Sequence, residues 1–256
     1  SRALTDVDLA KRAIALLDLT ELGDGTGPEE VRELCRKALG RAGIPAVAAV
    51  CVWPRHVALA NGLLAGRAKV ATVVNFPAGD APLGAVLAET RDALHSGADE
   101  IDLVIPYKAF LAGDAAAAAA MVGQVKALLP PGRRLKTILE TGSYPDAAAI
   151  RAAADLAIGA GADFVKTSTG KIARGASLVA ARAMLEAIRD SGRPVGLKPS
   201  GGIRTPADAA AYLALADAVM GPGWATPATF RFGASGLWDA LVAVIEGRDS
   251  APGSGY

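Results

Sequence analysis

Apolar residues along the chain fall into short continuous runs, which alternate with longer stretches of mixed apolar and polar character. Eight short runs predict strands, at residues 46–52, 69–76, 100–105, 134–140, 164–168, 195–199, 218–221 and 230–234. Continuous apolar runs, rather than strict alternation, are typical of strands that are buried on both faces of a parallel sheet. The pattern therefore predicts a parallel sheet in which helices follow the strands.

The stretches between these runs carry helix signals. Pro28, followed by Glu29 and Glu30, predicts a helix start, because proline suits the first turn and acidic residues complement the helix dipole. Thr205 before Pro206 predicts an N-cap. Further helices are predicted at residues 83–96, 146–160 and 178–189, and the alanine run at 115–120 is interpreted as helix interior. Residues 221–227 leave no room for a full helix before the last predicted strand.

These repeated units predict a single-domain α/β protein, a (β/α)8 TIM barrel over residues 1–247 with a short N-terminal helical extension. A length of 256 residues suits one such barrel. A doubly wound open sheet is the structural alternative. Residues 248–256 are rich in Gly, Ser and Pro, which predicts a flexible C-terminal tail.

Composition narrows the classes of partner. The net charge is +1 and no block of basic residues stands out, so neither nucleic acid nor a membrane surface is an expected partner. No segment approaches the roughly 20 continuous apolar residues of a membrane span, and the polar N-terminus does not resemble a signal peptide. Two cysteines without a CxxC motif predict a reduced, cytoplasmic protein.

Three ionisable residues lie inside predicted strands, namely Asp102, Lys166 and Lys198. Burying an unpaired charge is costly, so such residues pair with one another or serve a reaction. The two lysines come from consecutive strands near their carboxyl ends, which form the catalytic face of a barrel. The alternative is a buried ion pair that only stabilises the barrel.

Two lysines held close together in a dry pocket point to a defined chemistry. Mutual repulsion and burial both lower the pKa of an amine, which makes it a nucleophile at neutral pH. A neutral amine attacks a carbonyl to form an iminium, which acidifies the adjacent carbon and gives an enamine. Asp102 is positioned in the sequence to relay the protons that these steps require.

Glycine-rich segments follow several of the strands. Ser200-Gly201-Gly202 leads towards the helix that Thr205 caps, and Gly233-Ala234-Ser235-Gly236 follows the last predicted strand. Such turns let backbone N–H groups approach an oxyanion, and barrels often bind phosphate near their last strands. Thr169-Gly170-Lys171 adds donors and a positive charge. The alternative is that these glycines only allow tight strand-to-helix turns.

Other residues support no further chemistry. His56 and His95 have no partner at metal-ligand spacing, and no cofactor motif is present, so neither a metal nor a cofactor is expected. Cys51 is interpreted as a buried structural cysteine. Lys136 and Glu140 share a face of one predicted strand and are interpreted as a structural ion pair.

Several segments together resemble the deoxyribose-phosphate aldolase family, and the resemblance covers essentially the whole chain. Residues 164–171 resemble its Schiff-base motif, 195–205 its second-lysine motif, and 100–107 the segment with its proton-relay aspartate. Residues 17–20, 51–55 and 75–79 also follow the family pattern.

This resemblance implies reversible cleavage of 2-deoxy-D-ribose 5-phosphate into acetaldehyde and D-glyceraldehyde 3-phosphate. It implies that Lys166 forms the Schiff base, that Lys198 lowers its pKa, and that Asp102 moves protons with Lys198. It further implies that Tyr256, the last residue, reaches the active site and assists proton transfer; a disordered end is the alternative. The substrate-binding residues that it implies are Thr20, Thr169, Gly170, Lys171, Gly201, Gly202, Arg204, Gly233, Ser235 and Gly236.

Two positions depart from the family pattern. Gly236 stands where close relatives have a serine, and Gly23 stands where they have an asparagine. Both departures bear on substrate affinity. The alternatives in function are another class I barrel aldolase or transaldolase that acts on a longer sugar phosphate, and a non-catalytic sugar-phosphate-binding barrel. The expected partners are a small sugar phosphate and an aldehyde, and the resemblance implies a monomer or a homodimer.

Overall fold

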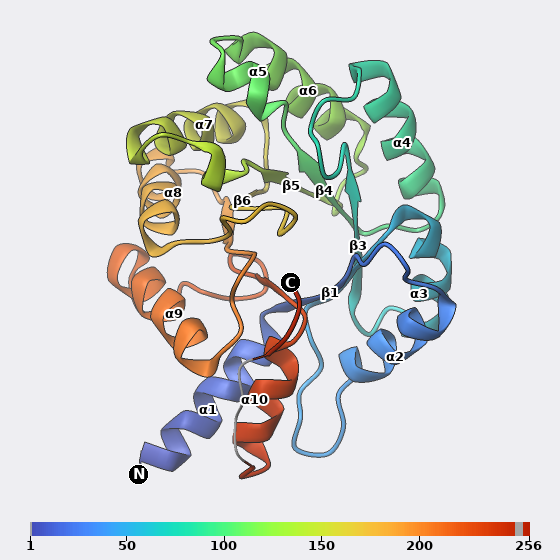
Figure 1. The fold of residues 1–256 in the computed structure, drawn as a ribbon, viewed down its shortest axis with the longest axis vertical. Coiled ribbons are helices and arrows are strands. Elements are labelled where there is room, and N and C mark those ends of the chain that lie inside the picture. The colour runs from blue at the N-terminus through green and yellow to red at the C-terminus, as the bar shows by residue number, and fades with distance from the viewer. Residues whose placement is uncertain (1, 249–252) are drawn as a thin grey trace.

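The computed structural model describes residues 2–248 and 253–256. Its eight strands are all parallel and form one sheet in the order β7-β6-β5-β4-β3-β2-β1-β8. Parallel bridges from Leu197 to Phe230 and from Ser200 to Gly233 join the two ends of this order. The sheet is therefore closed into a barrel, with helices arranged in a ring around it (Figure 1).

The bounds of the strands are β1 Leu17–Glu21, β2 Ala49–Val52, β3 Lys69–Val74, β4 Glu100–Val104, β5 Arg134–Ile138, β6 Phe164–Lys166, β7 Gly196–Lys198 and β8 Phe232–Ala234. The α-helices are α1 Arg2–Ala15, α2 Pro28–Ala38, α3 Val57–Leu64, α4 Leu83–His95, α5 Tyr107–Leu111, α6 Ala115–Leu128, α7 Ala147–Ala160, α8 Leu178–Ser191, α9 Pro206–Met220 and α10 Leu237–Ile245. Two short 3-10 helices are η1 Pro54–His56 and η2 Thr141–Ser143.

The predicted barrel is confirmed, but one of the predicted strands is wrong. Residues 218–221 belong to the end of α9 and its C-cap, because a short apolar run at a helix end has the same appearance as a short strand. The true first strand, β1, was not predicted. Its sequence Leu-Asp-Leu-Thr-Glu alternates apolar and polar residues, yet the first four are buried, so Asp18 and Thr20 face the barrel interior. The other seven predictions each contain a strand of the barrel.

The helix boundaries follow from capping residues. Thr205 accepts from the N–H of Asp208, whose carboxylate accepts from the N–H of Thr205, so α9 begins with a complete capping box. Asp146 and Ser177 cap α7 and α8 in the same way through their side-chain oxygens. Such caps fix where the chain leaves each strand-to-helix loop, and these loops form one end of the barrel.

The buried apolar residues form two clusters, a large one and a small one. The larger core lies between the strands and the ring of helices and extends to α1, which packs along α10 below the barrel in Figure 1. A smaller apolar cluster consists of Leu22, Cys51, Ala71 and Val73 with the half-buried Trp53 and Phe76. Among the described residues, no helix combines the length and the apolar character that a membrane crossing requires.

Candidate active site

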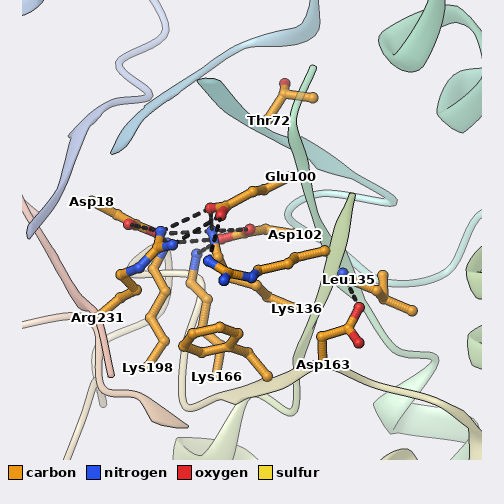
Figure 2. Close-up of polar contacts among 12 residues, drawn as sticks. Asp18, Thr72, Glu100, Asp102, Leu135, Lys136, Asp163, Lys166, Lys198 and Arg231 are labelled. Carbon is orange, nitrogen blue, oxygen red and sulfur yellow. Dashed lines mark hydrogen bonds and ion pairs between the residues drawn. The ribbon is translucent and has the colours of Figure 1, made fainter. Parts of the chain in front are cut away.

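The strand register brings the three predicted charged residues to one place inside the barrel. Lys166 and Lys198 are register partners at the ends of neighbouring strands β6 and β7. Asp102 lies in the middle of β4, and all three side chains are fully buried. The carboxylate oxygen Oδ2 of Asp102 accepts hydrogen bonds from Lys198 at 2.8 Å and from Lys166 at 3.0 Å (Figure 2). One carboxylate oxygen therefore joins two ammonium groups.

These three residues are part of a larger set of buried charges that ion pairs connect. We call this set the buried charge cluster; its members are Asp18, Glu100, Asp102, Lys136, Lys166, Lys198 and Arg231. Figure 2 shows these side chains converging; six of them come from the five strands β1, β4, β5, β6 and β7, and the seventh is Arg231, the residue just before β8. Four cations thus face three carboxylates, and the cluster carries one positive charge in excess when every member is ionised.

Lys136 is the most highly paired cation of the buried charge cluster. It donates to Oδ1 of Asp102 at 3.0 Å and to Oδ2 of Asp18 at 2.8 Å, and it pairs with Glu100 at 2.8 Å. Arg231 donates hydrogen bonds to Asp18 and to both oxygens of Glu100. These contacts fix the orientation of the carboxylates on which Lys166 and Lys198 depend.

Sequence analysis did not single out Asp18, Glu100 or Arg231. Asp18 could have been found, because it lies in an otherwise apolar run; the position of Arg231 next to a short strand gave no comparable signal. The predicted pairing of Lys136 with Glu140 is wrong. Glu140 has a left-handed backbone with φ of 61° beyond the end of β5, so the alternation of faces stops before it.

Glu140 instead holds the loop after β6. Its carboxylate is fully buried and accepts from the Thr169 N–H at 3.0 Å and from the Thr169 hydroxyl at 2.6 Å. The same hydroxyl accepts from the N–H of Lys171 at 3.0 Å. Thr169, which was predicted to contact a substrate hydroxyl, is therefore engaged with its own loop in this structure.

The pKa values of the lysines differ from the expectation drawn from the sequence. Burial alone would lower the pKa of Lys166, but the neighbouring Tyr256 and the Asp102 carboxylate outweigh it and raise that pKa. For Lys198, burial likewise lowers the pKa, whereas Asp102 and Asp18 raise it to a greater extent. The expected lowering of the lysine pKa is therefore wrong for the free site, because it considered burial and the facing lysine without the carboxylates between them.

The predicted phosphate residues lie around the mouth of the barrel. A cavity of about 390 Å³ brings together most of the predicted substrate-binding residues, namely Thr20, Gly170, Lys171, Gly201, Gly202, Arg204 and Ser235. Gly233 and Gly236 do not line this cavity. A Cβ on Gly233 would meet the side chains of Ser200 and Lys198, whereas one on Gly236 would meet the end of the chain.

The described end of the chain, residues 253–256, reaches into the barrel mouth, where Figure 1 shows the C-terminus. The Tyr256 ring lies 5.9 Å from Nζ of Lys166, and its hydroxyl donates to the carbonyl of Ser168 at 3.4 Å. Tyr256 is therefore placed beside the candidate nucleophile. Residues 249–252 lie outside the described residues, and the flexibility of the tail remains a prediction.

Cys51 lies in the small apolar cluster that borders this site. It is fully buried, as expected of a structural cysteine, and burial raises the pKa of its thiol. The described residues contain no group of three or more His, Cys, Asp or Glu side chains arranged to hold a metal ion. The arrangement suits amine chemistry: two buried lysines share one carboxylate, and the ring of Tyr256, which lines the cavity, lies 5.9 Å from Nζ of Lys166.

Comparison with known proteins is consistent with this geometry. The family model for DeoC/LacD family aldolases matches residues 12–235. The chain is 49% identical over 252 residues to the deoxyribose-phosphate aldolase of Agrobacterium fabrum, covering 97% of this chain and 96% of that protein.

Solved structures agree with this match. A crystal structure from Toxoplasma gondii, described as that of a candidate deoxyribose-phosphate aldolase, has a TM-score of 0.88 and 26% identity over 97% of this chain and 98% of that one. The deoxyribose phosphate aldolase of Aeropyrum pernix has a TM-score of 0.69 and 29% identity over 94% of this chain and 91% of that one.

Proposed function

This chain belongs to the DeoC/LacD aldolase family, and we propose that it cleaves 2-deoxy-D-ribose 5-phosphate reversibly into acetaldehyde and D-glyceraldehyde 3-phosphate. It is a carbon–carbon lyase. The observation that carries the proposal is the pair of fully buried lysines on one oxygen of Asp102 at the carboxyl end of the barrel. An ion pair that served stability alone would not require a second lysine on the same oxygen.

Lys166 is the nucleophile in this proposal. Each cluster lysine pairs with a different number of carboxylates: Lys166 with one, Lys198 with two and Lys136 with three. Loss of one proton also removes the excess positive charge of the cluster. Lys166 is assigned this role because it gives up the fewest carboxylate ion pairs when it loses a proton, although Tyr256 and the Asp102 carboxylate raise its pKa above the ordinary value.

The reaction then follows from amine chemistry. The neutral Lys166 amine adds to C1 of the open-chain sugar, and loss of water gives an iminium. Removal of the proton from the C3 hydroxyl breaks the C2–C3 bond, which releases D-glyceraldehyde 3-phosphate and leaves an enamine on Lys166. Protonation of C2 gives the iminium of acetaldehyde, and addition of water returns acetaldehyde and the free amine.

Proton transfer is assigned to the groups around Lys166. Oδ2 of Asp102 lies between Lys166 and Lys198, so it can pass protons between them and a bound water. The hydroxyl of Tyr256 is placed to protonate C2, since its ring lies beside Lys166. The 5-phosphate would bind at the cavity mouth, near the turns of Gly170, Gly201 and Gly202.

The remaining elements of the proposal concern the setting of the enzyme. A cytoplasmic location fits the two cysteines, which are both buried and free. Assembly as a monomer or homodimer is likewise part of the proposal. A non-catalytic sugar-phosphate-binding barrel would not require two buried lysines on one carboxylate oxygen with a tyrosine ring beside them.

Borohydride reduction in the presence of acetaldehyde tests the proposal. Reduction of the iminium would leave a stable ethyl group on the nucleophile, and peptide mass spectrometry would locate it. We expect the adduct on Lys166 in the wild-type protein and no adduct in Lys166→Ala, with the exposed Lys69 unmodified as an internal control. Folded protein that yields no adduct on any lysine would exclude Schiff-base chemistry and, with it, the proposed function.

A further inference from the structure

The last four residues of the chain, 253–256, bind beside the candidate active site through hydrogen bonds to Arg204, Ser235 and Gly236, which we call the tail seat. The Gly253 N–H donates to the carbonyl of Arg204 at 2.8 Å, and Nε of Arg204 donates back to the carbonyl of Gly255 at 3.0 Å. The Gly236 N–H donates to the carbonyl of Ser254 at 3.1 Å. The tail is therefore bound through its backbone, over and above the contacts of the Tyr256 ring.

Ser235 completes this seat. Its hydroxyl accepts from the N–H of Tyr256 at 3.1 Å and donates to the carbonyl of Ser254 at 3.4 Å. Arg204, Ser235 and Gly236 are thus all engaged by the tail. The same three residues were predicted, on independent grounds, to bind the phosphate of the substrate.

Gly236 is a glycine because of the tail and not because of its own backbone. Its φ of −65° and ψ of −17° are open to any residue. The atoms that a Cβ at this position would meet first are the backbone N and O of Ser254, with which it would overlap, and the carbonyl carbon of Gly253 at 2.7 Å. A side chain here would therefore collide with the docked tail.

Gly253 shows the reciprocal relationship. A Cβ on Gly253 would overlap the carbonyl group of Gly236 and would lie 2.7 Å from the backbone nitrogen of Leu237. Two glycines, 17 positions apart in numbering, thus face each other at a contact that leaves no room for a side chain on either.

We infer that the Gly236–Gly253 contact seats the tail on donors of the phosphate site, so that the tail and the substrate phosphate compete for the Gly236 N–H and the Arg204 guanidinium. This inference rests on the proposed function, with Arg204 and Gly236 among the substrate-binding residues that the family resemblance implies. A donor that is bonded to a tail carbonyl has to release it before it can bond an oxyanion. Gly236 is then a specificity-determining residue: it sets how strongly a phosphate is required to open the site.

The competition has a calculable consequence. If only the undocked fraction binds phosphate, the apparent Kd equals the intrinsic Kd divided by that fraction. A tail docked about nine-tenths of the time would weaken phosphate binding about tenfold. Competition is reciprocal, so bound phosphate must also shift the tail towards the undocked state, to an extent that grows with the phosphate concentration.

Calorimetric titration of the protein with inorganic phosphate tests whether the docked tail weakens phosphate binding. Gly236→Ala and Gly253→Ala keep every backbone donor but cannot form the contact, so both should bind phosphate about tenfold more tightly than wild type. Gly25→Ala, where a Cβ meets nothing within 4 Å, is the matched control and should bind phosphate as wild type does. Equal Kd values in wild type and both seat variants would overturn the inference.

Carboxypeptidase digestion tests whether phosphate releases the tail, because such an enzyme removes an aromatic C-terminal residue only from an undocked tail. Phosphate should accelerate the release of Tyr256 from wild type, whereas Gly236→Ala should lose it rapidly with or without phosphate. If phosphate does not change the rate at which Tyr256 is released from wild type, the tail and phosphate do not compete.

The two tests also separate this inference from the proposed function. If no variant binds phosphate while acetaldehyde is still trapped on Lys166, the aldolase chemistry stands and both the phosphate site and the competition fail. If phosphate binds with the expected differences and Lys166 is not trapped, the tail seat stands and the proposed reaction fails.

Discussion

Lys136 donates a hydrogen bond to Oδ1 of Asp102 at 3.0 Å, the oxygen that does not contact Lys166 or Lys198. The carboxylate is therefore held from both ends. Because Lys136 is fully buried and also pairs with Asp18 and Glu100, it contributes a fixed positive charge to the floor of the site. Both its position and its charge bear on how readily Lys166 loses a proton.

Replacement of Lys136 by Met should shift the pH dependence of turnover. The variant retains three cations against three carboxylates, so the excess positive charge is gone and the ammonium of Lys166 becomes more favourable. The pKa of Lys166 should rise further, and the low-pH limb of kcat/KM should move to higher pH. Lys69→Met, on the exposed residue at the start of β3, is the matched control. Reduced turnover with an unshifted limb would show that Lys136 acts only in stability.

Replacement of Lys198 by Leu should reduce turnover more severely. It removes a cation and also the second donor to Oδ2 of Asp102, so both the proton relay and the electrostatic balance change. General acid–base groups typically contribute about 10²- to 10⁴-fold to rate. We expect a loss of kcat in that range, measured as cleavage of 2-deoxyribose 5-phosphate, together with slower trapping of acetaldehyde on Lys166. Full activity at neutral pH in this variant would contradict the mechanism.

Asp18 should make the protein sensitive to acid. Burial would raise the pKa of Asp18, but Lys136, Lys198 and Arg231 outweigh it and hold that pKa well below its ordinary value. A lowered pKa stabilises the folded state above the unfolded value of about 3.9, and this stability is lost as the pH falls through and below that value. The free energy of unfolding from urea denaturation should therefore fall steeply below about pH 4.

The Asp18→Asn variant should be less stable than wild type at pH 7 and should lose less stability on acidification. Asp190 offers a matched control, because Arg189 and Arg151 also lower its pKa but the residue is exposed. Asp190→Asn should follow the wild-type curve, because surface ion pairs contribute little to stability. An acid limb that is as steep in Asp18→Asn as in wild type would assign the sensitivity to other carboxylates.

The sequence was sufficient to predict the barrel and to bring out three residues of the candidate site. Lys166, Lys198 and Asp102 stood out because charge inside an apolar strand is rare, and they do meet. The remaining cluster members depend on barrel closure. Asp18 and Arg231 come from opposite ends of the chain and meet only because β1 pairs with β8. The lysine pKa values were expected to fall because only burial and the facing lysine were considered. Tyr256 and Asp102 raise the pKa of Lys166, and Asp102 with Asp18, which was not singled out, raises that of Lys198.

The active-site tyrosine gives the last prediction, which separates its hydroxyl from its ring. Tyr256→Phe keeps the tail contacts but has no proton to give, so turnover should fall by about 10²-fold or more if the hydroxyl protonates the enamine. Trapping of acetaldehyde on Lys166 should persist, while exchange of the methyl protons of acetaldehyde in D2O should slow.

Gly170→Ala should also slow this exchange, but by displacing the Tyr256 ring, because its Cβ would overlap that ring. Gly43→Ala is its control, with a similar positive φ of 80° and no neighbour within 4 Å, so any cost of about 1–2 kcal/mol from the backbone alone appears in both. If Tyr256→Phe exchanges protons as fast as wild type while Gly170→Ala does not, the ring matters as a cover for the site, and the proton comes from elsewhere.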